Sequence, residues 1–266
     1  MGVPQIKTLS EFNKITFEFH EGDFDCPVHG TVNSRYWLRS DGTKQWDECP
    51  MCAQKRQEEE ERKRIEANKK ALHERYALSR VKAKFYAMNF ANYKIGNDSQ
   101  SDALEKVALI AGGSSNRSLL LLGPNGVGKT MLASIAVMQR GGAIYKMYEI
   151  GMRIKASYKN SSTESEQDIL TELAKLPLLV IDEVGRQFGS ESEKNWLSYV
   201  IDERYADDLP TILISNLKLS SECSKTELEQ GVYIEHYLGK DSVSRLVECA
   251  DIVTVTGDDY RRRNKA

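Results

Sequence analysis

The stretch SLLLLGPNGVGKTMLASIAVM, Ser118–Met138, decides the fold of this 266-residue chain. Its apolar run, Leu119–Leu122, predicts a buried strand, and MLASIAVM predicts the helix that follows. Between them, GPNGVGKT matches the phosphate-loop pattern G-x-x-x-x-G-K-[ST]. In such a loop the backbone N–H groups surround phosphate oxygens, and the helix N-terminus adds partial positive charge. The order strand, loop, helix therefore predicts a phosphate site in an α/β domain.

Every residue of this loop is a candidate nucleotide contact. Lys129 has the reach to bind the β- and γ-phosphates, and the Thr130 hydroxyl is a candidate ligand of Mg²⁺. The other candidates contribute mainly backbone groups: Gly123, Pro124, Asn125, Gly126, Val127 and Gly128.

An acidic pair, Asp182 and Glu183, follows a second apolar run at Leu178–Ile181. Ligands of parallel sheets bind beyond the carboxyl ends of the strands, so we expect Asp182 to hold Mg²⁺ directly or through water. Glu183 is the candidate for orienting the attacking water. The chain has neither the N-K-x-D motif of guanine readers nor an LSGGQ-like signature. The pair favours ATP hydrolysis over GTP hydrolysis or phosphoryl transfer to a metabolite.

Four apolar runs separated by helix-length segments extend this pattern: SLLLLG, AIYKMY, LPLLVID and PTILISN. Such alternation predicts a parallel sheet with helices on both faces. Upstream, residues 53–76 lack Gly and Pro and set glutamates four positions ahead of Arg and Lys, which favours a solvated helix. We expect a cysteine-rich module at residues 1–52, a charged connecting helix at 53–84 and the α/β domain at 85–266.

Two short motifs, Cys26-Pro-Val-His29 and Cys49-Pro-Met-Cys52, indicate a metal site in the first module. Two ligands from each motif complete the four-coordinate Cys₃His shell of structural zinc. The residues between them read as two strands joined by a tight turn at Asp41-Gly42. A ribbon this small needs the metal for much of its folding energy. His20 is a weaker alternative to His29 because it lies outside the paired motifs.

The composition favours a protein of the cell interior. The net charge is −2 and the pI about 6.2, so any nucleic-acid site must be local. No apolar run approaches the length of a membrane span, and the N-terminus lacks a secretory layout. Five cysteines without a signal sequence argue for a reducing compartment, and we expect a cytoplasmic location.

The segments NYKIGNDSQSDALEK, GPNGVGKT, LLVIDEVGRQ and PTILISN resemble, in that order, the AAA+ helicase loaders of the DnaC/DnaI type. The resemblance covers roughly Phe85 to Arg262 and implies a three-layer AAA+ phosphate-loop domain with ATPase activity. Many AAA+ proteins add a helical lid after the sheet. This chain stops soon after Arg263, as the short loaders do, so we expect an absent or reduced lid.

Three more site residues follow from the resemblance alone. Asn216, after the strand PTILIS, corresponds to the residue that senses the γ-phosphate in the family. Arg245 in DSVSRL corresponds to the arginine finger that acts on a neighbouring subunit, with Arg204 as a rival of lower rank. Arg261 in DDYRRR corresponds to a second sensor.

The resemblance also implies partners. DnaI-like loaders grip a hexameric, DnaB-type replicative helicase through an N-terminal zinc module, bind single-stranded DNA and self-associate through the ATPase domain. The candidate DNA contacts lie in MRIKASYKNSS, which offers cations and an aromatic ring for base stacking: Arg153, Lys155, Tyr158 and Lys159. An amphipathic surface helix with Tyr158 packed inward is the alternative for that segment.

The expected function is therefore ATP-dependent loading of a replicative helicase onto single-stranded DNA, with DNA-stimulated hydrolysis. Two alternatives remain open at this level. One is an IstB-like transposition ATPase that assembles on double-stranded DNA with a transposase. The other is a nucleotide-gated adaptor that binds ATP and barely hydrolyses it.

Overall fold

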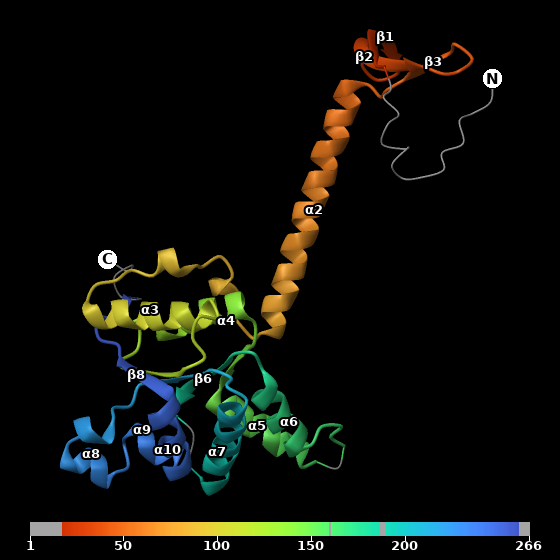
Figure 1. Ribbon diagram of the computed structural model, residues 1–266. Coiled ribbons are helices and arrows are strands. Elements are labelled where there is room, and N and C mark those ends of the chain that lie inside the picture. The colour runs from red at the N-terminus through yellow and green to blue at the C-terminus, as the bar shows by residue number, and fades with distance from the viewer. Residues whose placement is uncertain (1–17, 160, 187–189, 261–266) are drawn as a thin grey trace. The chain divides into compact units, whose positions relative to one another are not determined.

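The computed structural model describes residues 18–159, 161–186 and 190–260 of the chain (Figure 1). It divides into two compact units, with the boundary between Ala71 and Leu72. Among the described helices, none combines the length and the apolar character needed to cross a membrane.

The first unit contains a small antiparallel sheet in the order β1-β2-β3. Its strands are β1 (His20–Cys26), β2 (Gly30–Leu38) and β3 (Lys44–Trp46). The predicted hairpin around Asp41-Gly42 is confirmed as β2 and β3, whereas β1 was not foreseen. Half-buried aromatic rings pack against one another in this sheet. The ring centroid of Trp46 lies 4.8 Å from that of Tyr36 and 5.6 Å from that of Phe24.

Helix α2 (Pro50–Leu78) follows the sheet and buries none of its residues. Its charges pair along the helix, with Glu59 close to Arg62 and Lys63, and Glu61 close to Arg64. Exposed pairs of this kind contribute only a few tenths of a kcal/mol each. The helix is therefore stabilised mainly by the intrinsic helix propensity of its residues.

A five-stranded parallel sheet forms the centre of the second unit, in the order β5-β6-β7-β4-β8. Its strands are β4 (Ser118–Leu122), β5 (Ala143–Lys146), β6 (Leu179–Val184), β7 (Thr211–Ser215) and β8 (Ala250–Thr254). The predicted parallel sheet is confirmed, and each of the four apolar runs contributes one strand. Strand β4, which lies between β7 and β8, is buried throughout because helices cover both faces of the sheet.

Two helical layers enclose this sheet (Figure 1). One layer consists of α3 (Asp98–Ala111) and α4 (Lys129–Arg140). The other contains α5 (Met147–Ser157), α6 (Glu166–Lys175), α7 (Glu191–Ala206), α9 (Ile234–Leu238) and α10 (Lys240–Cys249). Alternate residues of β4 divide between them, with Leu119 and Leu121 in the first core and Leu120 and Leu122 in the second.

Short elements complete the unit. They are the 3₁₀ turns η1 (Ala83–Phe85), η2 (Phe90–Asn92) and η3 (Ser220–Glu222), and the helix α8 (Lys225–Glu229). The described chain continues past β8 through residues 255–260.

Arg204 is a charged side chain at the centre of the second unit, only 1% exposed. Its guanidinium donates five hydrogen bonds, to the Thr211 hydroxyl (2.8 Å) and to four backbone carbonyls. These carbonyls belong to Leu173, Ala174, Leu176 and Pro210. Burial lowers the pKa of Arg204 to about 10, still well above neutrality. The residue therefore joins α7 to the end of α6 and the start of β7.

We expect Arg204→Met to lower the free energy of unfolding by about 3–5 kcal/mol, since it leaves several buried carbonyls without donors. Chemical unfolding measures this loss. Arg245→Met is the control, because it removes an exposed arginine with one ion pair and should cost no more than about 1 kcal/mol. Equal stability of the two variants would contradict the assignment.

Candidate functional site

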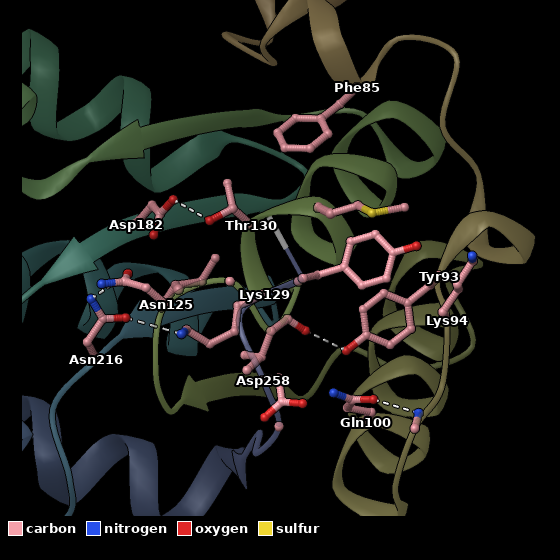
Figure 2. Close-up of a pocket in the computed structure, with 18 of the residues that line it drawn as sticks. Phe85, Tyr93, Lys94, Gln100, Asn125, Lys129, Thr130, Asp182, Asn216 and Asp258 are labelled. Atoms are coloured by element: carbon pink, nitrogen blue, oxygen red, sulfur yellow. Dashed lines mark hydrogen bonds between the residues drawn. The ribbon is translucent and has the colours of Figure 1, made fainter. Parts of the chain in front are cut away.

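A cavity of about 600 Å³ lies at the carboxyl ends of β4, β6 and β7 (Figure 2). Residues 125–130 of the loop after β4, the acidic pair of β6 and Asn216 after β7 line it, whereas Gly123 and Pro124 are not among the lining residues and accept hydrogen bonds from Lys129. Residues 92–97 line it as well, together with Gly257, Asp258 and Tyr260. The candidates Gly126–Thr130, Asn125, Asp182, Glu183 and Asn216 are thus brought together, although they come from three separate parts of the chain.

The phosphate loop is held in a conformation that only glycine adopts easily. Gly128 has φ +96°, and a Cβ there would lie 2.4 Å from the Tyr93 ring. Tyr93 is 8% exposed, and its hydroxyl donates to the Val127 carbonyl at 3.0 Å. Burial raises the pKa of Tyr93 to about 12, so the hydroxyl remains a donor at neutral pH. Tyr93 therefore supports the loop from behind.

Lys129 lies inside the loop and is 5% exposed. Its Nζ donates to the carbonyls of Gly123 (2.6 Å) and Pro124 (2.7 Å) and to Asn216 Oδ1 (3.2 Å). Asn216 in turn donates from Nδ2 to Asn125 Oδ1 at 3.0 Å. A network of this kind holds the ammonium group at the position where phosphate oxygens would arrive.

Thr130 and Asp182 form the pair suited to Mg²⁺. Thr130 Oγ1 donates to Asp182 Oδ2 at 2.9 Å, and Asp182 is 7% exposed. Neighbouring ligands of octahedral Mg²⁺, at about 2.1 Å from the ion, lie about 3 Å apart. The hydroxyl and carboxylate oxygens present here fit that spacing and chemistry, whether the carboxylate binds directly or through water.

Glu183 has an unusual backbone. Its φ is +60°, the left-handed region that non-glycine residues seldom occupy, and the pairing of β6 with β7 is irregular between Ile181 and Val184. Such strain costs about 1–3 kcal/mol and is commonly found where a side chain must be aimed. Glu183 lies within β6, and with this strained backbone it contributes to the cavity wall.

Two cations hold that carboxylate. Lys146 Nζ, at the end of β5, lies 2.9 Å from Glu183 Oε1, and Arg186 lies 3.3 Å from Oε2. Partial burial acts to raise the pKa of Glu183, but Lys146 and Arg186 outweigh it and the pKa is lowered. The carboxylate is therefore ionised at neutral pH and engaged by Lys146 rather than directed at the phosphate loop.

The arginine candidates differ in accessibility. Arg245 is exposed on α10, where it pairs with Asp202 at 3.1 Å and lies over the Tyr205 ring. Arg204 is buried and fully used within its own domain, which rules it out as a residue that reaches another subunit. Arg261 lies outside the described residues.

The four DNA candidates lie near the end of α5 in different settings. Tyr158 is 61% exposed, so it is not packed inward, and its hydroxyl donates to Glu166. Lys155 and Lys159 are exposed as well. Arg153 instead makes ion pairs with both Glu164 and Glu172, which raise its pKa further. Its charge is thus already neutralised by two carboxylates.

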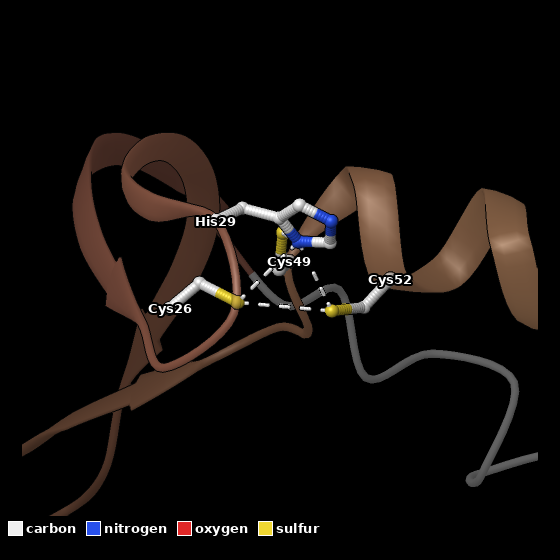
Figure 3. A group of neighbouring side chains, drawn as sticks. All are labelled: Cys26, His29, Cys49 and Cys52. Carbon is white, nitrogen blue, oxygen red and sulfur yellow. Dashed lines mark hydrogen bonds between the residues drawn. The ribbon is translucent and has the colours of Figure 1, made fainter.

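The first unit brings together the four predicted metal ligands (Figure 3). Cys26 ends β1, His29 follows in the turn, and Cys49 and Cys52 flank the start of α2. Cys26 Sγ lies 3.7 Å from both Cys52 Sγ and His29 Nδ1, and the latter lies 3.5 Å from Cys49 Sγ and 3.4 Å from Cys52 Sγ.

These separations are those of a zinc tetrahedron. With Zn–S near 2.3 Å and Zn–N near 2.0–2.1 Å, tetrahedral ligands lie about 3.5–3.8 Å apart. The backbone N–H of Val28 lowers the pKa of Cys26 to about 6, whereas the neighbouring Cys26 thiol raises that of Cys52 to about 11. A divalent cation would relieve the repulsion among three thiolates. His20 lies outside the cluster and packs its ring on Tyr36.

We expect the purified chain to carry one zinc ion and Cys49→Ser to lose it, with a much lower melting temperature of the ribbon. Metal analysis gives the first result and tryptophan fluorescence of the ribbon the second. Cys223→Ser, a half-buried cysteine of the other unit, is the control. A metal-free ribbon that melts like the wild type would contradict the assignment.

Tyr93, Gln100 and Lys146 are among the residues of this cavity that sequence reasoning missed. Tyr93 and Gln100 lie in NYKIGNDSQSDALEK, which the family resemblance singled out without giving them a role. Lys146 is the last residue of β5 and lies at the same edge of the sheet as Asp182. The rule that parallel strands present their carboxyl ends to the ligand could have identified it.

Comparison with known proteins agrees with this geometry. A family model described as "IstB-like ATP binding protein" matches residues 55–266. The replicative helicase loader DnaC of Escherichia coli K12 is 31% identical over 135 residues, which cover 48% of this chain and 55% of DnaC. The chain thus matches only about half the length of that relative.

Solved structures of the same type share the fold. A crystal structure of the DnaC helicase loader superimposes with a TM-score of 0.53 at 22% identity, covering 66% of this chain and all of that one. A crystal structure of DnaI gives 0.50 at 18% identity, covering 66% and 94%. At these identities the likeness establishes the fold. The family match and the assembled phosphate loop together identify the chain as a member of the IstB-like ATP-binding protein family with a DnaC/DnaI-type AAA+ fold.

Proposed function

We propose that this chain is an ATP-dependent loader that delivers a hexameric, DnaB-type replicative helicase onto single-stranded DNA. The observation that carries the proposal is the convergence of Lys129, Thr130, Asp182, Glu183 and Asn216 on one cavity in a DnaC-type fold. The metal ribbon and α2, which precede that fold in the chain, supply a candidate attachment for the helicase.

The cavity has two chemically distinct ends, which orient the nucleotide. The phosphates would lie on the loop, with Mg²⁺ between Thr130 and Asp182. Ile95 and Tyr260 also line the cavity and are 51% and 39% exposed. Exposed apolar side chains beside a polar site suit a purine ring. We therefore place the adenine at the end formed by residues 92–97 and 257–260.

Hydrolysis in this proposal depends on Glu183 leaving Lys146. Once the carboxylate turns from Lys146 towards the γ-phosphate, it orients the attacking water. Lys129 and Asn216 hold the γ-phosphate oxygens. The exposed Arg245 is the residue that would contribute its charge to the nucleotide of a neighbouring subunit, after release from Asp202.

Glu183→Gln should keep ATP and Mg²⁺ binding while kcat falls about 10²-fold or more, because an amide cannot accept the proton of water. Steady-state hydrolysis and a fluorescent-nucleotide titration measure the two quantities. Glu227→Gln is a matched control, since Glu227 also pairs with a lysine at 2.9 Å but lies outside the cavity. Full turnover in Glu183→Gln would move the water-orienting role to another residue.

Single-stranded DNA is proposed to contact Lys155, Tyr158 and Lys159, with Arg153 remaining in its ion pairs. A DNA base of any kind can stack on an exposed aromatic ring, and a loader needs contacts of this kind, which do not depend on the DNA sequence. Helix α5 begins directly after Lys146 and carries Lys155, with Tyr158 and Lys159 just past its end, which supports a link between DNA contact and the Lys146–Glu183 pair.

Loading itself is testable with the replicative helicase of the source cell and circular single-stranded DNA. We expect the wild-type chain with ATP to raise the fraction of helicase bound to the circles, and Lys129→Ala to abolish that gain while Lys218→Ala retains it. Lys218 is an exposed lysine outside the cavity. Stable complexes with a transposase on double-stranded DNA, and none with the helicase, would favour a transposition ATPase. Loading that persists undiminished in Glu183→Gln, which should keep ATP binding but lose hydrolysis, would favour a nucleotide-gated adaptor that barely hydrolyses ATP.

A further inference from the structure

Gln100 is a buried amide in the first turn of α3, 9% exposed. Its Oε1 accepts the Gly96 N–H at 2.7 Å, and its Nε2 donates to the Thr256 carbonyl at 3.0 Å. One side chain thus joins two segments that are 160 residues apart in sequence and that both line the nucleotide cavity beyond the phosphate loop. Figure 2 shows Gln100 on the same side of the cavity as Tyr93 and Asp258.

The second segment is built to approach this amide closely. Gly257 has φ +128°, and a Cβ on it would lie 2.6 Å from Gln100 Nε2. Asn97 and Ser99 anchor the preceding residue, through Asn97 Nδ2 to the Thr256 carbonyl (3.1 Å) and the Thr256 N–H to Ser99 Oγ (2.9 Å). Of these three side chains, Gln100 is the one that also accepts a hydrogen bond from the Gly96 N–H. It therefore connects the segment around Gly96 to the segment that begins at Thr256.

The same segment then reaches the phosphate loop. The Tyr260 N–H donates to the Gly126 carbonyl at 3.1 Å, and a Cβ on Gly126 would overlap Asp259. Residues 257–260 are therefore held at one end by the group around Gln100 and at the other by the loop. Between these two attachments they form the part of the wall against which we place the nucleoside.

We propose that Gln100 is a positioning residue that fixes the nucleoside-binding wall of the cavity, by tying Gly96 to the Thr256–Tyr260 segment. A buried amide whose oxygen and nitrogen are both hydrogen-bonded fixes the positions of its partners. An apolar side chain of the same size would leave the Gly96 N–H without an acceptor and remove one of the donors to the Thr256 carbonyl. The inference rests on the proposed binding of ATP. It assigns Gln100 to nucleoside affinity and not to the chemical step.

Gln100→Met keeps the volume of the side chain and removes both hydrogen bonds. We expect the Kd of ATP and of ADP to rise about tenfold, kcat at saturating ATP to stay within twofold, and the Kd of tripolyphosphate, which lacks a nucleoside, to stay within twofold. Hydrogen exchange of residues 257–260, measured without nucleotide, should accelerate about tenfold or more.

Two further variants sharpen the test. Gly257→Ala approaches the same contact from the other side, and should reproduce the loss of nucleotide affinity and the faster exchange. Gln167→Met removes a glutamine that bonds Tyr199 on the exposed surface of α6 and should change none of these readouts.

Three results would overturn the inference. They are unchanged nucleotide affinity and exchange in a folded Gln100→Met chain, a fall in kcat without a change in KM, or equal weakening of ATP and tripolyphosphate. Failure of the wild-type chain to bind ATP would instead overturn the proposed function. The wild-type titration therefore separates the two failures.

Discussion

The parallel pairing of β4 with β7 on one side and β8 on the other is the constraint on which the second unit depends. Because the strands run the same way, the phosphate loop after β4, Asn216 after β7 and residues 255–260 after β8 all emerge at one edge of the sheet. The acidic pair of β6 joins them through the next strand along. No local preference of these segments could bring Lys129, Asp182, Asn216 and Tyr260 together without that common direction.

Much of this could be predicted from the sequence because the decisive signals are local. The phosphate loop is contiguous, and its glycines and Lys129 predict a phosphate-binding site from eight consecutive residues. The two cysteine motifs likewise carry their own ligand spacing, and the structure places Cys26, His29, Cys49 and Cys52 at tetrahedral distances. The alternation of apolar runs with helix-length segments was sufficient to predict the parallel sheet.

What could not be predicted depends on contacts between distant segments. Gln100 and Arg204 look like surface residues in their own stretches of sequence, yet both are buried by partners that lie elsewhere in the chain. The pairing of Lys146 with Glu183 needs β5 and β6 to be neighbours in the sheet, which the order of elements alone does not specify. Strand β1 alternates charged and apolar residues weakly and was missed for that reason.

The left-handed backbone at Glu183 sets stability against activity at a single position. Glycine would relax a φ of +60° by about 1–2 kcal/mol, but it would also remove the carboxylate that this residue of β6 contributes to the cavity wall. If Glu183 orients the attacking water as proposed, random substitution followed by selection for thermal resistance alone would reward loss of hydrolysis at this residue. A glutamate at this strained position is accounted for by the proposed use of its carboxylate and not by the stability of the fold.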